Sequence, residues 1–241
     1  MPIAPPRFSI IIPARNEEAS IGRCLASILA AQAVFPCTLE IIVVLNRCTD
    51  RTEEIVRAAG CRVVVENAKN LAAIRNAGAR LAEGDIIVTV DADSTVSTNM
   101  LSAIDRTLQQ QDTIGGGVVI APERYSVGIL ITALYLLPIA LRHGISAGLF
   151  FCARTDFNAI GGFDETLVSV EDIDFARRLK LHGKKSGRRF VTLFRSHIVT
   201  SCRKFDRLGD WYFVFRPHLV WTLLKGRNQS QADKIWYEFE R

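Results

Sequence analysis

The first hundred residues alternate between short apolar runs and segments with helical periodicity, and this alternation limits the possible folds more than any other feature. The apolar runs are Phe8–Ile12, stopped by Pro13, then Leu39–Leu45, Arg62–Val65 and Asp85–Val90. Each has the length and the Ile and Val content of a buried strand. The segments between them place apolar residues at helical spacing, with Asn16 and Asp50 as candidate caps and Gly60 as a helix end. Strands and helices that alternate with short links predict an α/β fold with a mostly parallel central sheet flanked by helices.

The second half is less regular. Its expected strands are Ile114–Ile120, Leu149–Ala153 and Phe190–Leu193, and its expected helices are Met100–Leu108, Val127–Leu141 and Glu171–Leu181. Gly161 and Gly162 indicate a tight turn, and Gly183 is expected just past a helix end. We therefore predict a single domain with a nucleotide-binding half (1–98), an acceptor-binding half (99–205) and a C-terminal helical tail (206–241).

Three polar segments directly follow apolar strands of the first half: Pro13–Glu17, Asn46–Asp50 and Asp91–Asp93. Ligands of parallel α/β sheets bind beyond the carboxyl ends of the strands, so the three segments are expected at one rim. On an extended chain Asp91 and Asp93 point the same way and can face one hard cation, Mn²⁺ or Mg²⁺. Such a cation would bridge the phosphates of a nucleotide diphosphate. The alternative is an acidic turn without a ligand.

Composition limits the partners and the cellular location that can be expected for the protein. The 241 residues carry a net charge of +5, and the basic residues gather after position 176, which suits an anionic partner or a solvated face. Nucleic acid is not the expected partner, because the predicted rim is acidic. None of the six cysteines forms a C-x-x-C pair, and the first eight residues lack the pattern of a signal peptide, so a reducing, cytoplasmic location is expected.

The apolar segment Val127–Leu141 has about 15 residues, fewer than the ~20 that span a bilayer. Three interpretations stay open for it. The helix packs on the sheet, it contacts a second subunit of a homodimer, or it lies at a membrane surface beside a lipid-linked acceptor.

The ordered motifs of the chain resemble those of family 2 glycosyltransferases. They are Ile11–Glu17 (IIPARNE), Asn46–Thr52 (NRCTDRT), Ala73–Gly78 (AIRNAG), Val90–Asp93 (VDAD), Gly161–Glu165 (GGFDE) and Glu171–Asp174 (EDID). Each motif is loose on its own, but their order and spacing agree from about Phe8 to Arg207. The resemblance implies a GT-A fold, a UDP- or GDP-sugar donor, a divalent metal and an acceptor hydroxyl.

The resemblance also implies roles for single residues on the donor side. Pro13, Arg15 and Glu17 would line the nucleoside pocket, and Asn46 would lie beside the base or ribose. Arg75 would approach the diphosphate, which a guanidinium can bind through two hydrogen bonds. Asp93 would be the main metal ligand, with Asp91 nearer to the ribose or the sugar.

On the acceptor side, Glu171 would contact substrate, and Asp172 would be the general base that takes the proton of the attacking hydroxyl. Asp172 opens a predicted helix, where acids are also favoured for stability alone. His197 would complete the metal shell or serve structure. Arg203 and Lys204 would hold the leaving diphosphate or form a surface pair, and Trp211 is a candidate acceptor contact.

Two departures from the family pattern concern the donor site. Leu45-Asn46 replaces two consecutive acids, which leaves the nucleobase open, and Arg47 and Arg51 replace small residues. The predicted activity is metal-dependent, inverting transfer of a sugar. The alternatives are an inactive module that binds a nucleotide or a membrane, and a sugar-1-phosphate nucleotidyltransferase. The second is disfavoured because Pro13–Glu17 contains no glycine.

Overall fold

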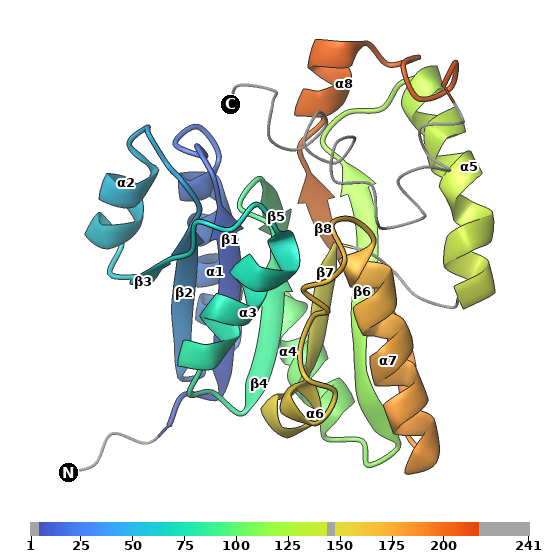
Figure 1. The fold of residues 1–241 in the computed structure, drawn as a ribbon. Coiled ribbons are helices and arrows are strands. Elements are labelled where there is room, and N and C mark those ends of the chain that lie inside the picture. Colours follow the sequence, from blue (N-terminus) through green and yellow to red (C-terminus); the bar gives the residue numbers. More distant parts are fainter. Residues whose placement is uncertain (1–4, 144–147, 217–241) are drawn as a thin grey trace.

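The computed structural model describes residues 5–143 and 148–216 (Figure 1). The strands in this part are β1 (Phe8–Ala14), β2 (Leu39–Leu45), β3 (Arg62–Val65), β4 (Ile86–Val90), β5 (Ser94–Val96), β6 (Thr113–Pro122), β7 (Leu149–Ala153) and β8 (Arg189–Thr200). The helices are α1 (Ile21–Val34), α2 (Thr52–Ala58), α3 (Leu71–Leu81), α4 (Met100–Leu108), α5 (Val127–His143), α6 (Arg154–Ala159), α7 (Glu171–Lys185) and α8 (Arg203–Leu208).

The strands form one sheet in the order β3-β2-β1-β4-β7-β6-β8-β5. The first four are parallel to one another, β7 is antiparallel to both β4 and β6, β6 and β8 are parallel, and β5 is antiparallel to β8. The predicted α/β fold with a mostly parallel sheet is therefore confirmed. The carboxyl ends of β1, β2 and β4 meet at one edge of the sheet.

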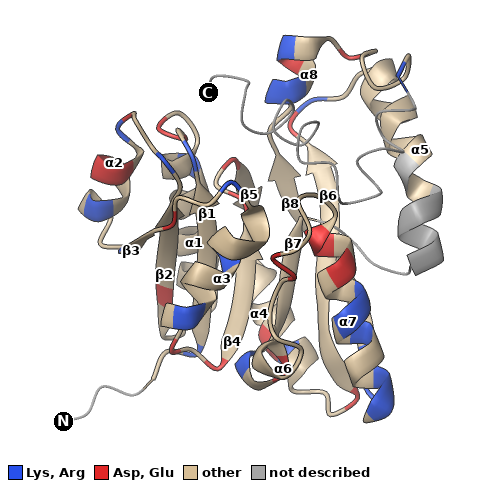
Figure 2. Cartoon of the chain, in the orientation of Figure 1, with Lys and Arg blue, Asp and Glu red and all other residues tan. Residues whose placement is uncertain are grey.

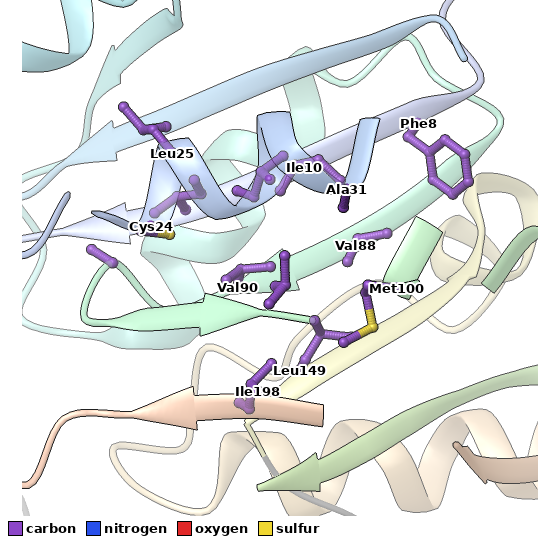
Figure 3. Close-up of a cluster of buried hydrophobic side chains, with 14 of the residues drawn as sticks. Phe8, Ile10, Cys24, Leu25, Ala31, Val88, Val90, Met100, Leu149 and Ile198 are labelled. Atoms are coloured by element: carbon purple, nitrogen blue, oxygen red, sulfur yellow. The ribbon is translucent and has the colours of Figure 1, made fainter. Parts of the chain in front are cut away.

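Two hydrophobic clusters cover the two faces of the sheet. Ile10 and Ile12 belong to the cluster of α1 and α4, whereas Ile11 belongs to the cluster of α3, α6 and α7. Neighbouring residues of a strand point to opposite faces, so β1 is buried on both sides and needs an unbroken apolar run. Figure 3 shows the first cluster, in which Cys24 and Leu25 of α1 lie over the strands.

The second cluster contains four phenylalanines that connect the helices in front of the sheet. Phe163 stacks on Phe175 of α7 with ring centroids 4.3 Å apart, and Phe157 of α6 lies 5.5 Å from Phe175. Phe150 of β7 approaches Phe175 edge-on at 5.7 Å. The cluster fixes the segment before α7 onto the sheet, which matters because that segment reaches the site described below.

Several element boundaries differ from those expected from sequence. β1 continues through Pro13 to Ala14, because its pairing with β4 ends at Ile11 and the missing N–H of Pro13 therefore costs no bond on that side. α7 continues past Gly183 to Lys185. A Cβ at Gly183 would come within 2.8 Å of Ile114, so this glycine permits close packing and does not end the helix.

Helix starts also correct two expected caps. The N-cap of α1 is Ser20 and not Asn16, and the N-cap of α2 is Arg51. Asp50, the residue before this N-cap, still accepts a hydrogen bond from the backbone N–H of Thr52 at 3.0 Å. The short elements β5, α6 and α8 were not expected at all, because three to six residues carry too little periodicity.

The one sheet runs through both predicted halves, which meet between β5 and α4. Of the predicted helical tail, α8 and a turn region up to residue 216 are described, and residues 217–241 lie outside the described residues. No helix in the described part is both long and apolar enough to cross a bilayer. The six cysteines are all free thiols.

Candidate functional site

A cleft of about 430 Å³ opens at the edge where β1, β2 and β4 end. Its walls come from the segments after these strands, from α3, from the segment before α7 and from α8. The structure brings together nearly all the residues proposed from sequence, namely Pro13, Arg15, Glu17, Asn46, Arg75, Asp91, Asp93, Glu171, Asp172, Arg203 and Lys204. Trp211 and His197 do not line this cleft.

The segment after β1 is tied to the segment after β2, and this places Glu17 in the cleft. Asn16 adopts a left-handed backbone conformation (φ 49°) and accepts a hydrogen bond from the backbone N–H of Thr49 at 2.8 Å. The next N–H, that of Glu17, donates to Oγ1 of Thr52 at 2.7 Å. Asn is among the residues that adopt this conformation most readily, so the sequence Asn16-Glu17 sets the turn that buries Glu17.

Asp50 supports the same turn. Burial favours its neutral form, but hydrogen bonds from the Thr52 hydroxyl and from the backbone N–H groups of Glu18 and Thr52 lower the pKa of Asp50 below its usual range. The ionised carboxylate therefore holds the two segments together at neutral pH.

Asn46 closes the base of the cleft at the end of β2. Its side-chain nitrogen donates to the carbonyl oxygens of Glu66 and Ala68, at 2.5 and 2.9 Å. These two acceptors fix which end of the amide is the nitrogen. The amide oxygen is buried without a hydrogen-bond partner in the described part of the chain.

Asp91 and Asp93 follow β4 and face the cleft from a turn, not from an extended segment as expected. The N–H of Ser94 donates to the carbonyl of Asp91 at 3.0 Å, which closes the turn and buries Ala92. Burial raises the pKa of Asp93 above its usual value, and the nearby charges of Asp91 and Glu17 raise it further. The charges of Arg203 and Lys204 act in the opposite direction and lower the pKa of Asp93.

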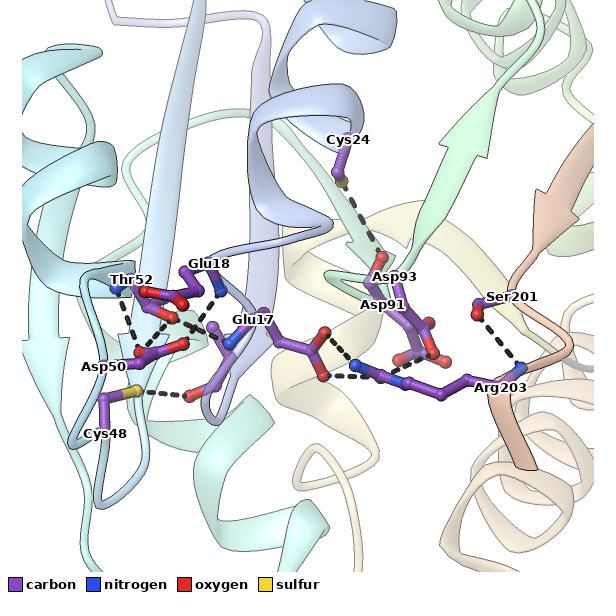
Figure 4. A network of polar contacts seen from close by, with 11 residues as sticks. Glu17, Glu18, Cys24, Cys48, Asp50, Thr52, Asp91, Asp93, Ser201 and Arg203 are labelled. Carbon is purple, nitrogen blue, oxygen red and sulfur yellow. Dashed lines mark hydrogen bonds and ion pairs between the residues drawn. The ribbon is translucent and has the colours of Figure 1, made fainter. Parts of the chain in front are cut away.

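Arg203 of α8 partly compensates this charge, as Figure 4 shows. Its guanidinium donates to both oxygens of Glu17 at 3.0 Å and to Oδ2 of Asp93 at 3.3 Å. Glu17 is 3 % exposed, whereas the side chain of Arg203 is 30 % exposed. Arg203 thus reaches from the solvent side into the acidic group formed by Glu17, Asp91 and Asp93.

The carboxylates of the acidic group are candidate ligands of a divalent cation. In residues 5–143 and 148–216, no three His, Cys, Asp or Glu side chains converge as a complete ligand set. The oxygens of Asp91 and Asp93 are nevertheless the hard ligands that Mg²⁺ and Mn²⁺ prefer, and both side chains line the cleft. Mg²⁺ is commonly bound by one or two carboxylates together with phosphate and water, and these residues fit that pattern.

His197 is the residue that the structure moves out of the proposed metal site. It lies on β8 between the buried Ser196 and Ile198, and its own side chain is exposed. Side chains alternate along a strand, so His197 points away from the face that its two neighbours bury. The expectation that it completes a metal shell is therefore corrected.

Arg75 lines the cleft and binds two protein carboxylates there. It lies on α3, is 5 % exposed, and donates to Oε1 of Glu171 at 2.8 Å and to Oδ1 of Asp91 at 3.0 Å. Its guanidinium carbon also lies 5.3 Å from the centre of the Phe163 ring. The side chain connects two walls of the cleft, and both of its terminal nitrogens already bind protein carboxylates.

Asp172 lies in the first turn of α7 at the wall opposite the segment after β1. Burial raises the pKa of Asp172 to about 6, and the charge of Glu171 raises it while that of Arg75 lowers it. A carboxylate with such a pKa is largely ionised at neutral pH and is still a useful proton acceptor. Asp172 lines the cleft, and its role as the general base stays a prediction.

The turn before α7 is fixed by α3. Asn76 accepts from the N–H of Phe163 and donates to its carbonyl, both at 2.9 Å. Gly161 and Gly162 have φ of 74° and 67°, and a Cβ at Gly162 would lie 2.6 Å from Oδ1 of Asn76. Glycine is required here both for the backbone conformation and for the space.

The cleft has apolar walls that sequence reasoning missed. They are supplied by Leu71, Ile74, Val168, Phe205 and Leu208. Apolar residues at helical spacing give no sign of whether they face a core or a ligand, so no pattern could have identified them.

Most late basic residues lie away from the cleft. In Figure 2 the first turn of α7 is coloured for acidic residues and its other end for basic ones, a distribution that suits the helix dipole. Of the late basic residues, Arg203, Lys204 and Arg207 line the cleft. Trp211 is 45 % exposed and stacks on Phe215, outside it.

Comparison with known proteins gives a consistent result. Residues 9–141 match the profile of glycosyl transferase family 2. A curated relative, the undecaprenyl-phosphate 4-deoxy-4-formamido-L-arabinose transferase of Pseudomonas paraeruginosa, is 34 % identical over 116 residues, which cover 44 % of this chain and 34 % of the relative. The chain thus spans about a third of the length of the curated relatives it matches.

Two solved structures share the fold. TarS 1-349 of S. aureus in complex with UDP-GlcNAc has a TM-score of 0.62 and 21 % identity, with 97 % of this chain and 71 % of that chain covered. Glucosyl-3-phosphoglycerate synthase of Mycobacterium tuberculosis, in complex with Mn²⁺, UDP and glucosyl-3-phosphoglycerate, has a TM-score of 0.62 and 20 % identity, with 92 % and 80 % covered. At this identity the likeness shows the fold alone.

Proposed function

The chain belongs to glycosyl transferase family 2, and we propose that it transfers a sugar from a nucleotide-diphospho-sugar to an acceptor in the cleft at the ends of β1, β2 and β4. The observation that carries the proposal is that Glu17, Asp93 and Asp172 line one cleft. These residues come from three segments far apart in the sequence. Together they offer a cation site on one wall and a base on another.

The donor would lie over the ends of β1 and β2. Pro13, Arg15, Glu17 and Asn46 would surround the nucleoside, as the family resemblance implies. The diphosphate would lie near Asp93, where Arg203 and Lys204 from α8 can donate to phosphate oxygens. Both structural relatives described above are complexes with UDP or a UDP-sugar, which supports a uridine donor, while Asn46 in place of an acid leaves guanosine as the alternative.

A divalent ion, Mn²⁺ or Mg²⁺, would be held by Asp93 with Asp91 beside it. When bound, it neutralises the charge that develops on the leaving diphosphate. The complex of the Mycobacterium tuberculosis relative with Mn²⁺ supports this assignment. Arg203 bonds Asp93 in the structure, and a cation at Asp93 would free Arg203 to turn toward the phosphates.

Asp172 would act as the general base. Its carboxylate accepts the proton of the acceptor hydroxyl as the acceptor oxygen bonds to the anomeric carbon and the bond to the diphosphate breaks. This is a single displacement and inverts the anomeric configuration. NMR assignment of the product anomer tests the stereochemistry, and a retained anomer would overturn it.

The acceptor would be lipid-linked. The curated relative is named for undecaprenyl phosphate, and α5 exposes an apolar stripe formed by Val127, Leu130, Leu134 and Leu137. A Cβ at Gly128 of α5 would lie 2.5 Å from the backbone of Asp210, so α5 packs closely against the segment that follows α8. An exposed apolar stripe on a helix suits peripheral contact with a membrane that carries the acceptor.

The test is sugar transfer to undecaprenyl phosphate in detergent, with UDP- and GDP-sugars and with Mn²⁺ or EDTA. The proposal expects a glycolipid product only with a matching donor and the metal. Binding of the donor without product for every acceptor, with Asp172→Asn unchanged, would favour the inactive binding module. Formation of a nucleotide-sugar from a sugar-1-phosphate would favour the nucleotidyltransferase.

A further inference from the structure

Arg75 is buried between two carboxylates that belong to different parts of the chain. Glu171 opens α7, and Asp91 follows β4. The side chain of Arg75 is 6 % exposed and that of Glu171 is 9 % exposed, so the ion pair between them is shielded from solvent. A buried charge pair with good geometry is costly to break, because the remaining charge stays in a poorly solvated place.

The start of α7 is held by the packing of Phe163 on Phe175 and by the ion pair from Arg75 to Glu171. Its N-cap residue, Val170, adopts a left-handed conformation (φ 59°) that is unfavourable for a β-branched residue, and its side chain makes no capping hydrogen bond. Such strain persists only where the surroundings hold it. The ion pair from Arg75 to Glu171 is a contact that fixes this first turn, and Asp172 is the next residue in it.

Arg75 is poorly placed to bind the diphosphate itself. Its terminal nitrogens point at Glu171 and Asp91, and its Nε is buried without a hydrogen-bond partner in the described residues. Reaching a phosphate would require breaking at least one of the two buried pairs. By contrast, Arg203 comes from the solvent side and is already near Asp93.

We infer that Arg75 is a positioning residue for the general base: through Glu171 it holds the first turn of α7, and with it Asp172, at a fixed place relative to Asp91 in the donor half. The inference rests on the proposed function, since it concerns the base of that reaction. It assigns to Arg75 a role other than the diphosphate contact that the family resemblance implies.

The charges around Asp172 give the inference a second consequence. The charged groups that face it are Glu171 from its own helix, Arg75 from α3 and Asp91 from the end of β4. Glu171 and Asp91 raise the pKa of Asp172, and Arg75 lowers it. Removing Arg75 and removing the charge of Glu171 therefore shift the pKa of Asp172 in opposite directions.

The main experiment compares Arg75→Lys and Arg75→Gln with the wild type in steady-state transfer and in donor binding by calorimetry. Misplacing a catalytic group by about 1 Å can cost on the order of 100-fold in rate, so kcat is expected to fall about that much in Arg75→Gln. The Kd of the UDP-sugar is expected to stay within about threefold of the wild-type value, because Arg75 is inferred not to bind the donor. Arg80→Gln, on the exposed side of the same helix, is the matched control and should leave both unchanged.

Arg75→Lys separates charge from geometry. Lysine keeps the positive charge but lacks the planar group that bonds two carboxylates at once. The pH profile of kcat in Arg75→Lys should stay close to that of the wild type, while kcat itself is about tenfold lower than in the wild type. In Arg75→Gln, the acidic limb of the kcat profile should move to higher pH.

Glu171→Gln is the second variant, because Arg75→Gln leaves a buried carboxylate unpaired and can fail to fold. Glutamine still accepts a hydrogen bond from Arg75 but carries no charge. The acidic limb should then move to lower pH. A limb that does not move in Glu171→Gln, or that moves in the same direction as in Arg75→Gln, contradicts the inference.

A readout independent of activity is the ¹³C NMR titration of the Asp172 carboxyl. Its pKa should rise in Arg75→Gln and fall in Glu171→Gln. If the wild type shows no transfer, the proposed function fails while this titration still decides the role of Arg75. If the wild type transfers sugar and Arg75→Lys loses donor binding tenfold or more with kcat intact, Arg75 binds the diphosphate and the inference is wrong.

Discussion

Two arginines, each shared between two carboxylates, face the same cleft, but they differ in how they are held. Arg75 pairs with Asp91 and Glu171 and is nearly inaccessible, whereas Arg203 pairs with Glu17 and Asp93 and is about one third exposed. Arg75 comes from a helix packed on the sheet, and Arg203 comes from the six-residue α8 near the end of the described chain.

The difference assigns different tasks to the two sides of the cleft. The ion pair of Arg75 with Glu171 has almost no access to solvent and keeps one geometry, which suits the side that carries the proposed base. Arg203 is partly exposed although Glu17 is buried, so its guanidinium can leave the pair for another partner, which suits the side that receives a cation and a diphosphate. Changes on the Arg75 side should therefore affect the rate of reaction and the fold, and changes on the Arg203 side should affect binding.

The largest expected effect is that of Asp172→Asn on catalysis. Loss of the general base should lower kcat about 1,000-fold while the donor Kd stays within about threefold. Folding raises the pKa of Asp172 to about 6, so the folded state disfavours the ionised carboxylate. The free energy of unfolding therefore falls as pH rises toward 6. At pH 7 the melting temperature of Asp172→Asn should not be lower than that of the wild type.

Transfer kinetics, calorimetry and thermal unfolding check this prediction. Asp174→Asn is the control, because Asp174 is on the same turn but pairs with Arg178. Retention of more than about a tenth of the wild-type kcat in Asp172→Asn would assign the base elsewhere.

The two arginines should differ next in stability. Arg75→Gln leaves Glu171 buried and unpaired, which typically costs about 3 kcal/mol. In Arg203→Gln, water can take the place of the partly exposed guanidinium beside Glu17, so the cost should be about 1 kcal/mol. Urea unfolding at pH 7 measures both. Equal losses would remove the distinction between a fixed and an exchangeable ion pair.

A smaller effect is expected for the metal. In Asp93→Asn the affinity for the nucleotide in the presence of Mn²⁺ should fall about 30-fold, because the ligand that attracts the cation loses its charge. Without metal, the wild type and the variant should bind alike. Calorimetry gives the nucleotide Kd of the wild type and of the variant, each with and without Mn²⁺. Asp112→Asn, in an exposed pair with Arg189, serves as the control. A metal effect of the same size in Asp93→Asn would exclude Asp93 as the ligand.

The smallest effect is the dependence of rate on pH. The base must be ionised to accept a proton, so kcat should be constant above the pKa of Asp172 of about 6 and fall on acidification, by about tenfold at pH 5. A rate that rises between pH 7 and pH 5 would contradict the role of Asp172. The comparison requires checking that the protein stays folded over this range.

Strands in both halves of the fold could be predicted from their apolar runs. Leu39–Leu45 in the first half and Leu149–Ala153 in the second begin and end as the apolar runs do. Polar residues directly after such strands meet at one edge of the sheet, and this rule placed Glu17, Asn46 and Asp93 in one cleft.

The remainder depends on contacts that leave no local pattern. Arg203 and Glu17 are 186 positions apart, and nothing in either segment indicates that they pair. Arg75 was expected at a phosphate because a guanidinium fits either partner, and only the fold shows that two carboxylates bind it. The side of β8 that His197 faces depends on an irregularity between Leu193 and His197, which spacing in the sequence does not reveal.

The most direct test of the central claim is the effect of Mn²⁺ with UDP on the backbone amide signals of the labelled protein. A paramagnetic ion broadens the signals of nearby residues most strongly, so a metal–nucleotide complex in the cleft should broaden those of Glu17, Asp93 and Asp172 more than that of His197. Broadening centred on His197, or none at Asp93, would contradict a cation–diphosphate site between the ends of β1 and β4 and the start of α7.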